Sequence, residues 1–321
     1  MTQSRFRKLA AAALLATLGV ILWGAYVRAT GSGAGCGSHW PTCNGQVIPR
    51  TDSTATFIEF THRVTSGLAF LLVALQLVWA LRAFPKGHPV RAGAAASMFF
   101  MVTEAGVGAL LVLFEYVADN ASVGRAVWMA VHLVNTFLLV AAMTCTVWWA
   151  RGGAPIRLRA QGATASLLGA GMAATLIVGV TGAIAALGDT LFAARSLAEG
   201  LAQDLSPTAH FLVQLRAMHP VAAALTGAYL FYLRAAIPAR RPSPSVRRLA
   251  NLTGALVAVQ LGAGVVNLAL LAPVWMQLVH LLLADLLWIS LVLLSAAALG
   301  DGPHLLRSRR REHERPALMG R

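Results

Sequence analysis

Residues 274–299 read VWMQLVHLLLADLLWISLVLLSAAAL, a run in which Asp285 is the only formally charged side chain. A helix that crosses a membrane needs about 20 mostly apolar residues, so this run is long enough to span a bilayer. It also contains His280, a polar side chain inside an otherwise almost entirely apolar segment. The run therefore predicts a transmembrane helix, and its histidine calls for an explanation.

Seven further segments are long and apolar enough to span a membrane. They lie at residues 9–28, 57–81, 93–117, 124–149, 161–187, 208–233 and 249–271. The composition agrees, because 57% of the 321 residues are hydrophobic and only 12% are charged, whereas soluble domains carry roughly 25% charged residues. We expect an all-α integral membrane protein with eight transmembrane helices, and the same numbers exclude a soluble, collagenous or coiled-coil chain.

The net charge of +14 is distributed unevenly along the chain. With a cytoplasmic N-terminus, the cytoplasmic segments are the N-terminus, residues 82–91, 151–159 and 234–248, and the C-terminal tail. These segments carry 20 of the 26 Lys and Arg residues and a net charge of +17, which leaves −3 for the rest of the chain. The positive-inside rule then places both termini in the cytoplasm of a multi-pass inner (plasma) membrane protein. The expected partner of the basic tail is the lipid bilayer, not nucleic acid.

The chain also contains weak internal repeats. Residues 21–33 (ILWGAYVRATGSG) resemble residues 178–190 (VGVTGAIAALGDT), and the histidine-containing segments around His132 and His280 both follow a Trp-Met pair. We therefore expect two pseudosymmetric four-helix bundles. The predicted domains are an N-terminal half at residues 1–155 and a C-terminal half, with the basic cytoplasmic tail, at residues 156–321.

Four of the nine histidines lie well inside the apolar runs: His62, His132, His219 and His280. All four are on even-numbered spans, roughly 8–17 Å below the outer ends of those helices. A lone histidine here is explained by a hydrogen bond in the core, but intramembrane polar groups usually mark function. Four at one depth favour metal ligation, and two facing imidazoles suit an iron porphyrin. We predict two bis-histidine haem sites, one in each half.

The residues three positions before these histidines differ between the halves. They are Glu59, Met129, Arg216 and Gln277. Only the N-terminal half has a carboxylate there, whereas Arg216 suits a haem propionate, as Arg63 and Arg125 do in the N-terminal half. The alternative for each arginine is that it reaches the membrane interface or pairs with a loop acid.

Two other acidic residues, Glu104 and Asp285, also lie deep in predicted spans. Glu104 is either part of a proton path or a protonated group that is hydrogen-bonded to a neighbouring helix. The sequence assigns no role to Asp285.

Cys36 and Cys43 lie in the first outer loop, where an oxidising compartment allows a disulfide. Such a bridge is either a structural staple or a redox-responsive bond. Cys145 is alone in an apolar run.

Four stretches resemble the heme A synthase family: GSGAGCGSHWPTCNGQVIP at 31–49, EFTHR at 59–63, LRAMHP at 215–220 and APVWMQLVHLLLADLLW at 272–288. The resemblance extends from about residue 17 to 299. It implies oxidation of the C8 methyl of haem O to a formyl group, which gives haem A for cytochrome oxidase, with oxygen as the oxidant. Members with a second cysteine pair carry it in the third outer loop, but residues 188–207 contain no cysteine here.

The resemblance also implies roles for individual residues. His62 and His132 would hold the substrate haem, and His219 and His280 would hold a haem b cofactor. Glu59 matches the carboxylate that is important for catalysis, and Cys36 and Cys43 match the disulfide of the outer loop. The implied partners are haem O synthase (protohaem farnesyltransferase) upstream, an electron donor that the residues do not identify, and cytochrome oxidase as the recipient of the product.

Two other classes of protein would use some of these features. A dihaem b-type cytochrome that only transfers electrons also needs four intramembrane histidines. It does not need Glu59, and haems that carry charge across a membrane often lie at opposite depths. A transporter built from repeats needs helices broken at matching places, and Pro220 has no counterpart after His62.

Overall fold

The computed structural model describes residues 3–50 and 53–300. Across these residues it is all-helical, without a named strand, and eight helical segments are long and apolar enough to cross a membrane. They are α1 (Gln3–Ala29), α2 (Thr54–Ala83), α3 (Pro89–Leu113), α4 (Val123–Ala150), α5 (Ala163–Leu191), α7 with α8 (Phe211–Arg240), α9 (Pro244–Ala269) and α10 (Val274–Gly300). The prediction of eight spans is confirmed.

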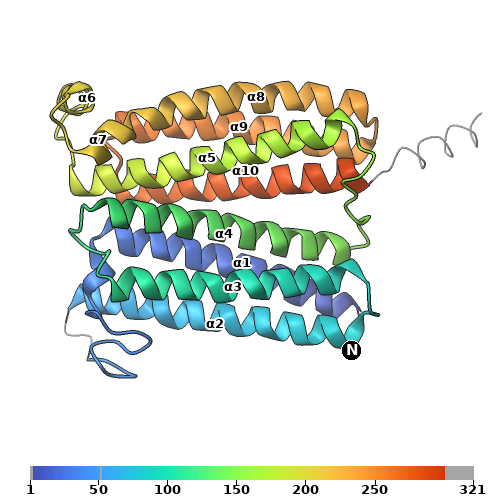
Figure 1. Ribbon diagram of the computed structural model, residues 1–321, viewed down its shortest axis with the longest axis horizontal. Helices are drawn as coiled ribbons and strands as arrows, with labels where there is room; N and C mark the ends of the chain where they lie inside the picture. Colours follow the sequence, from blue (N-terminus) through green and yellow to red (C-terminus); the bar gives the residue numbers. More distant parts are fainter. Residues whose placement is uncertain (1–2, 51–52, 301–321) are drawn as a thin grey trace, which may run out of the picture.

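The long helices lie side by side in two groups of four (Figure 1). The first group is α1–α4, and the second group is α5, α8, α9 and α10. Helices α1 and α4 of the first group contact α5 and α10 of the second. The predicted division into two pseudosymmetric halves, with its domain boundary, stays a prediction.

A buried aromatic contact joins the two groups. Trp288 of α10 is fully buried and stacks on Phe137 of α4, with ring centroids 5.2 Å apart. Its indole Nε1 also donates a hydrogen bond of 2.7 Å to the Phe137 carbonyl oxygen. Leu18 of α1 and Val292 of α10 complete the same apolar cluster. Side chains of both groups therefore form one core at this contact.

Residue 3 and residue 300 lie at the same end of the helices, as an even number of spans requires (Figure 1). The opposite end, called the loop end here, carries the connections at residues 30–50 and 192–210, the second of which contains α6 (Leu197–Leu205). The predicted basic tail, residues 301–321, lies outside the described residues.

The sixth span and the connection before it differ from the prediction, which had a single helix at residues 208–233 and no helix in the preceding connection. The span is divided at Ala217 into α7 (Phe211–Arg216) and α8 (Met218–Arg240). The division has a local cause, because the ring of Pro220 clashes with the carbonyl of Arg216 in a regular helix. Helix α6, which Ser196 caps by accepting from the Glu199 amide, was not predicted. It is short and has no buried residue, so it gives no span-like signal.

Candidate functional site

The four predicted histidines lie on the second and fourth helices of each group. His62 is on α2 and His132 on α4, whereas His219 is on α8 and His280 on α10. The imidazole rings of His219 and His280 lie with their centroids 6.4 Å apart and their planes at 87° to each other. The structure thus places His219 and His280 near each other, whereas the pairing of His62 with His132 stays a prediction.

Glycines on neighbouring helices make room for three of these imidazoles. A Cβ on Gly24 of α1 would lie 2.9 Å from Cε1 of His62, and a Cβ on Gly182 of α5 would lie 3.0 Å from Cε1 of His219. A Cβ on Gly264 of α9 would lie 3.2 Å from the same atom of His280. Real Cβ atoms essentially never approach within 3.0 Å. The first helix of each group therefore uses a glycine to seat the histidine of its second span.

Each ring has a different set of polar neighbours. Nε2 of His132 lies 3.1 Å from Oε1 of Glu104, and Nδ1 of His219 lies 3.1 Å from Oγ1 of Thr181. Nε2 of His280 lies 3.3 Å from the amide nitrogen of Gln260. Within the described part of the chain, the buried Nδ1 atoms of His62 and His280 have no hydrogen-bond partner.

Glu59 joins the first group to the outer loop. Its side chain is buried, and its Oε2 accepts a 2.8 Å hydrogen bond from the backbone amide of Cys36. Its Oε1 accepts a 2.5 Å hydrogen bond from Arg63, one helical turn further along α2. Cys36 and Cys43 form a disulfide, so the bridge is present as expected. Arg63 also donates to the backbone carbonyls of His39 and Thr42, both within the loop that the disulfide closes.

The other two arginines predicted to bind propionates are also engaged with protein groups. Arg125 is buried and donates to the carbonyls of Ala118 and Asn120, at 2.5 and 2.8 Å. Arg216 pairs with two carboxylates at the loop end, Asp189 at 3.0 Å and Asp204 at 2.7 Å. A propionate role for the three arginines stays a prediction, and Arg216 has the acidic partners named in the alternative.

The two deep carboxylates have opposite surroundings. Glu104 accepts hydrogen bonds from Thr136 at 2.5 Å and from the Asn135 amide at 2.6 Å, in addition to its contact with His132. Asp285 is fully buried, and neither of its oxygens has a hydrogen-bond partner among the described residues. It lies one turn before Trp288, on the face of α10 that contacts the first group.

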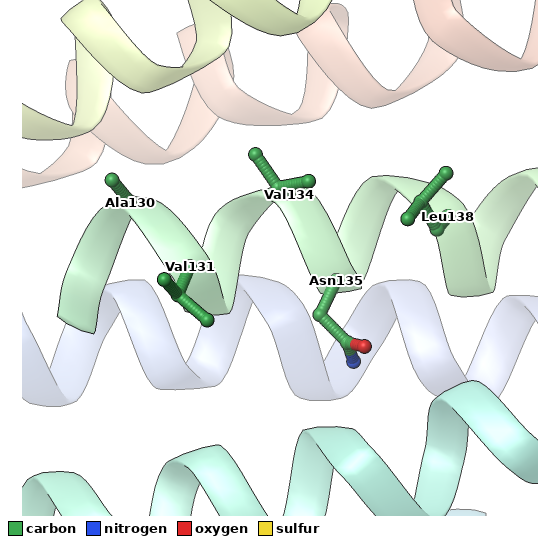
Figure 2. A pocket seen from close by; sticks show the side chains of 5 residues that line it. All are labelled: Ala130, Val131, Val134, Asn135 and Leu138. Carbon is green, nitrogen blue, oxygen red and sulfur yellow. The ribbon is translucent and has the colours of Figure 1, made fainter. Parts of the chain in front are cut away.

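A hollow of about 370 Å³ lies beside the histidine on α4. Its lining is Ala130, Val131, Val134, Asn135 and Leu138, and Figure 2 shows these side chains along the helix, with Asn135 pointing away from Ala130 and Val134. The lining is apolar except for Asn135, which is also bonded to Glu104. The hollow therefore connects to the polar contacts of the first group through Asn135 alone among its lining residues.

Sequence reasoning missed Arg28 and Gln260. Arg28 at the end of α1 donates hydrogen bonds to the Ala186 carbonyl at 2.7 Å, to Thr190 at 2.8 Å and to Gln277 at 2.7 Å, all in the second group. One signal was present in the sequence. Arg28 lies in the stretch 21–33, which resembles residues 178–190, and two of its partners, Ala186 and Thr190, lie in that second stretch. The partners of Gln260 depend on helix packing, and its sequence context gives no such signal.

Comparison with known proteins finds relatives that cover most of this chain. The model of the cytochrome oxidase assembly protein family (COX15-CtaA) matches residues 7–292. A Thermus thermophilus protein named protoheme IX farnesyltransferase is 55% identical over 299 residues, which is 93% of this chain and 49% of that protein. A protein of the same name from a second Thermus thermophilus strain matches to the same extent. This chain thus spans about half the length of these two relatives.

Proteins named heme A synthase are also similar over shorter stretches. The one from Geobacillus kaustophilus is 39% identical over 112 residues, 35% of each chain. The one from Symbiobacterium thermophilum is 44% identical over 93 residues, 29% of this chain and 30% of that protein. Because the family model covers most of the eight-helix chain, this chain belongs to the cytochrome oxidase assembly protein (COX15-CtaA) family.

Proposed function

We propose that this chain is a heme A synthase, a membrane oxidoreductase that converts the C8 methyl of haem O to a formyl group. The observation that carries the proposal is the asymmetry between two similar histidine pairs. Among the described residues, only the first group has a buried carboxylate, Glu59, that lies one turn from a pair histidine and accepts hydrogen bonds from two donors. Family membership and the similar proteins named heme A synthase support the same reading.

The residues of both pairs suit haem ligation. His219 and His280 would hold one haem iron between them, and their ring centroids stand 6.4 Å apart. Glycines beneath three of the rings and the buried, unpartnered Nδ1 of His62 are further features of a ligand site. We assign the substrate haem to His62 and His132, and haem b to His219 and His280.

The reaction removes four electrons from the methyl carbon and adds one oxygen atom. With molecular oxygen as the oxidant, one methyl group and one O2 give one formyl group and one water. Haem b, when bound, supplies one-electron redox chemistry. The mostly apolar, open hollow along α4 suits the hydrocarbon part of a farnesylated haem.

Glu59 is the catalytic residue in this proposal. Its two oxygens are fixed by the Cys36 amide and the Arg63 guanidinium, so the carboxylate keeps one orientation near His62. A fixed carboxylate stabilises positive charge that develops on a nearby carbon, or accepts a proton at Oε1 or Oε2. The disulfide loop contributes by holding the Cys36 amide against Glu59.

The partners follow from the chemistry of substrate and product. The Thermus relatives are named protoheme IX farnesyltransferase, and such an enzyme would supply a farnesylated haem. We propose this haem O synthase as the upstream partner and cytochrome oxidase as the recipient of haem A. The distribution of Lys and Arg supports a plasma-membrane location with both termini in the cytoplasm.

The test is expression of this chain and its Glu59→Gln variant in cells that make haem O, followed by extraction and chromatography of the haems. The native chain is expected to yield haem A, and Glu59→Gln to accumulate haem O or its alcohol while it retains haem b. Glu115→Gln, which removes an exposed carboxylate at the loop end, serves as the matched control. Normal haem A in Glu59→Gln would refute the role of Glu59. Haem b alone in the native chain would indicate an electron-transfer cytochrome instead.

A further inference from the structure

The third helix of each group presents a polar side chain to the histidine on the fourth. In the first group, Glu104 of α3 lies 3.1 Å from Nε2 of His132 on α4. In the second group, Gln260 of α9 lies 3.3 Å from Nε2 of His280 on α10. The two contacts involve the same ring nitrogen and equivalent helices, but one partner is a carboxylate and the other is an amide.

Glu104 and Gln260 differ in the number of hydrogen bonds that fix their side chains. Glu104 is anchored by Thr136 and by Asn135, and Asn135 in turn accepts from Thr103 at 2.6 Å. Gln260 lacks such support, because its buried Oε1 has no hydrogen-bond partner among the described residues. The carboxylate of the first group is therefore fixed against its histidine, and the amide of the second group is not.

Nε2 is the ring nitrogen farthest from the backbone, and so the one best able to reach an iron between helices. A nitrogen that shares its hydrogen with a carboxylate cannot use the same position to bind iron. Hydrogen bonds to ionised groups are roughly twice as strong as those between neutral groups. Glu104 therefore competes with iron for His132 more strongly than Gln260 competes for His280.

We infer that Glu104 is a positioning residue that keeps haem in the first group exchangeable, whereas Gln260 allows the second group to retain its haem. The inference rests on the proposed function, in which a substrate must leave after each reaction and a cofactor must stay. A single carboxylate-to-amide difference on the third helix then distinguishes a substrate site from a cofactor site built on the same ligands.

The test is a pair of reciprocal substitutions, Glu104→Gln and Gln260→Glu, in the full chain purified with its haems in detergent. Each protein is mixed with an excess of apomyoglobin, which accepts released haem, and the haem that remains bound is extracted and identified over time. Haem O or haem A reports the first group, and haem b reports the second. Glu104→Gln is expected to slow loss from the first group about tenfold, and Gln260→Glu to speed loss of haem b by a similar factor.

The opposite directions separate positioning from structural damage. A variant that is merely destabilised loses haem faster, so faster or unchanged loss from Glu104→Gln would overturn the inference. Unchanged loss of haem b from Gln260→Glu would do the same. The rate of haem loss is measured without turnover. Its outcome therefore tests the role of Glu104 separately from the proposed reaction. If only haem b is found, that absence of haem O and haem A refutes the proposed reaction. The first group is then measured alone in a His219→Ala background, where slower loss from Glu104→Gln would still support the role of Glu104 and faster or unchanged loss would overturn it.

Discussion

Replacing Arg28 by methionine is expected to weaken the contact between the two groups of helices. Arg28 belongs to α1, but its guanidinium donates to Ala186 and Thr190 of α5 and to Gln277 of α10. The methionine side chain fills a similar volume and donates to none of these acceptors. The substitution therefore removes the hydrogen bonds and leaves most of the apolar packing in place.

The size of the effect follows from the three hydrogen bonds that cross between the groups. Interhelical hydrogen bonds in membrane proteins contribute about 0.6 kcal/mol on average and about 1.7 at most. Their combined loss is then about 2 kcal/mol, with an upper bound of about 5 kcal/mol. At roughly 2–4 °C per kcal/mol, the lower figure corresponds to a decrease in Tm of about 4–8 °C.

The assay is thermal unfolding of the full chain in detergent, followed by circular dichroism. Arg7→Met is the matched control, because Arg7 lies on the same helix, is exposed, and makes no side-chain hydrogen bond among the described residues. Arg28→Lys keeps the positive charge but loses the forked donor geometry, and we expect an intermediate Tm. If Arg28→Met melts at the same temperature as Arg7→Met, the guanidinium does not hold the groups together.

Two further substitutions test the close packing of a glycine against His62 and the contact of Trp288 with Phe137 between the two groups of helices. Gly24→Ala places a methyl 2.9 Å from Cε1 of His62 and is expected to lower the content of substrate haem in extracts, whereas Gly19→Ala, which faces open space, should leave it unchanged. Trp288→Phe removes the hydrogen bond to the Phe137 carbonyl. It is expected to cost about 1 kcal/mol and lower Tm by a few degrees; an unchanged Tm would show that stacking alone suffices.

The helices were predictable from the sequence because each span is a dense local signal. About 20 apolar residues in a row have few interpretations, and all eight predicted spans exist. Their ends were less predictable, since helix α3 stops at Leu113, before the predicted end at 117. Glu115 takes a left-handed backbone conformation just beyond that end, and an apolar run does not reveal where a chain makes such a turn.

The candidate site was predictable where its residues are polar within otherwise apolar spans. Histidines inside apolar runs are conspicuous, and assigning two of them to each half led to the expectation that His219 and His280 lie near each other, as their rings do. The contact between Glu104 and His132 was not predictable, because it depends on which faces of α3 and α4 meet. Hydropathy reports how deep a residue lies, but not which residue it touches across a helix pair.

The placement of charge argues that the two groups diverged in chemistry while they kept the same ligands. Burying a carboxylate is costly unless it is paired and hydrogen-bonded. In the first group Glu59 is paired with Arg63, and Glu104 contacts His132 and two further donors. At the position equivalent to Glu104, the second group has the neutral Gln260. The second group also contains carboxylates, but among the described residues Asp285 has no hydrogen-bond partner, and Asp189 and Asp204 pair with Arg216 at the loop end. What sets the first group apart is that its paired carboxylates lie beside the proposed haem ligands, and that placement is what a group that oxidises and releases its ligand requires.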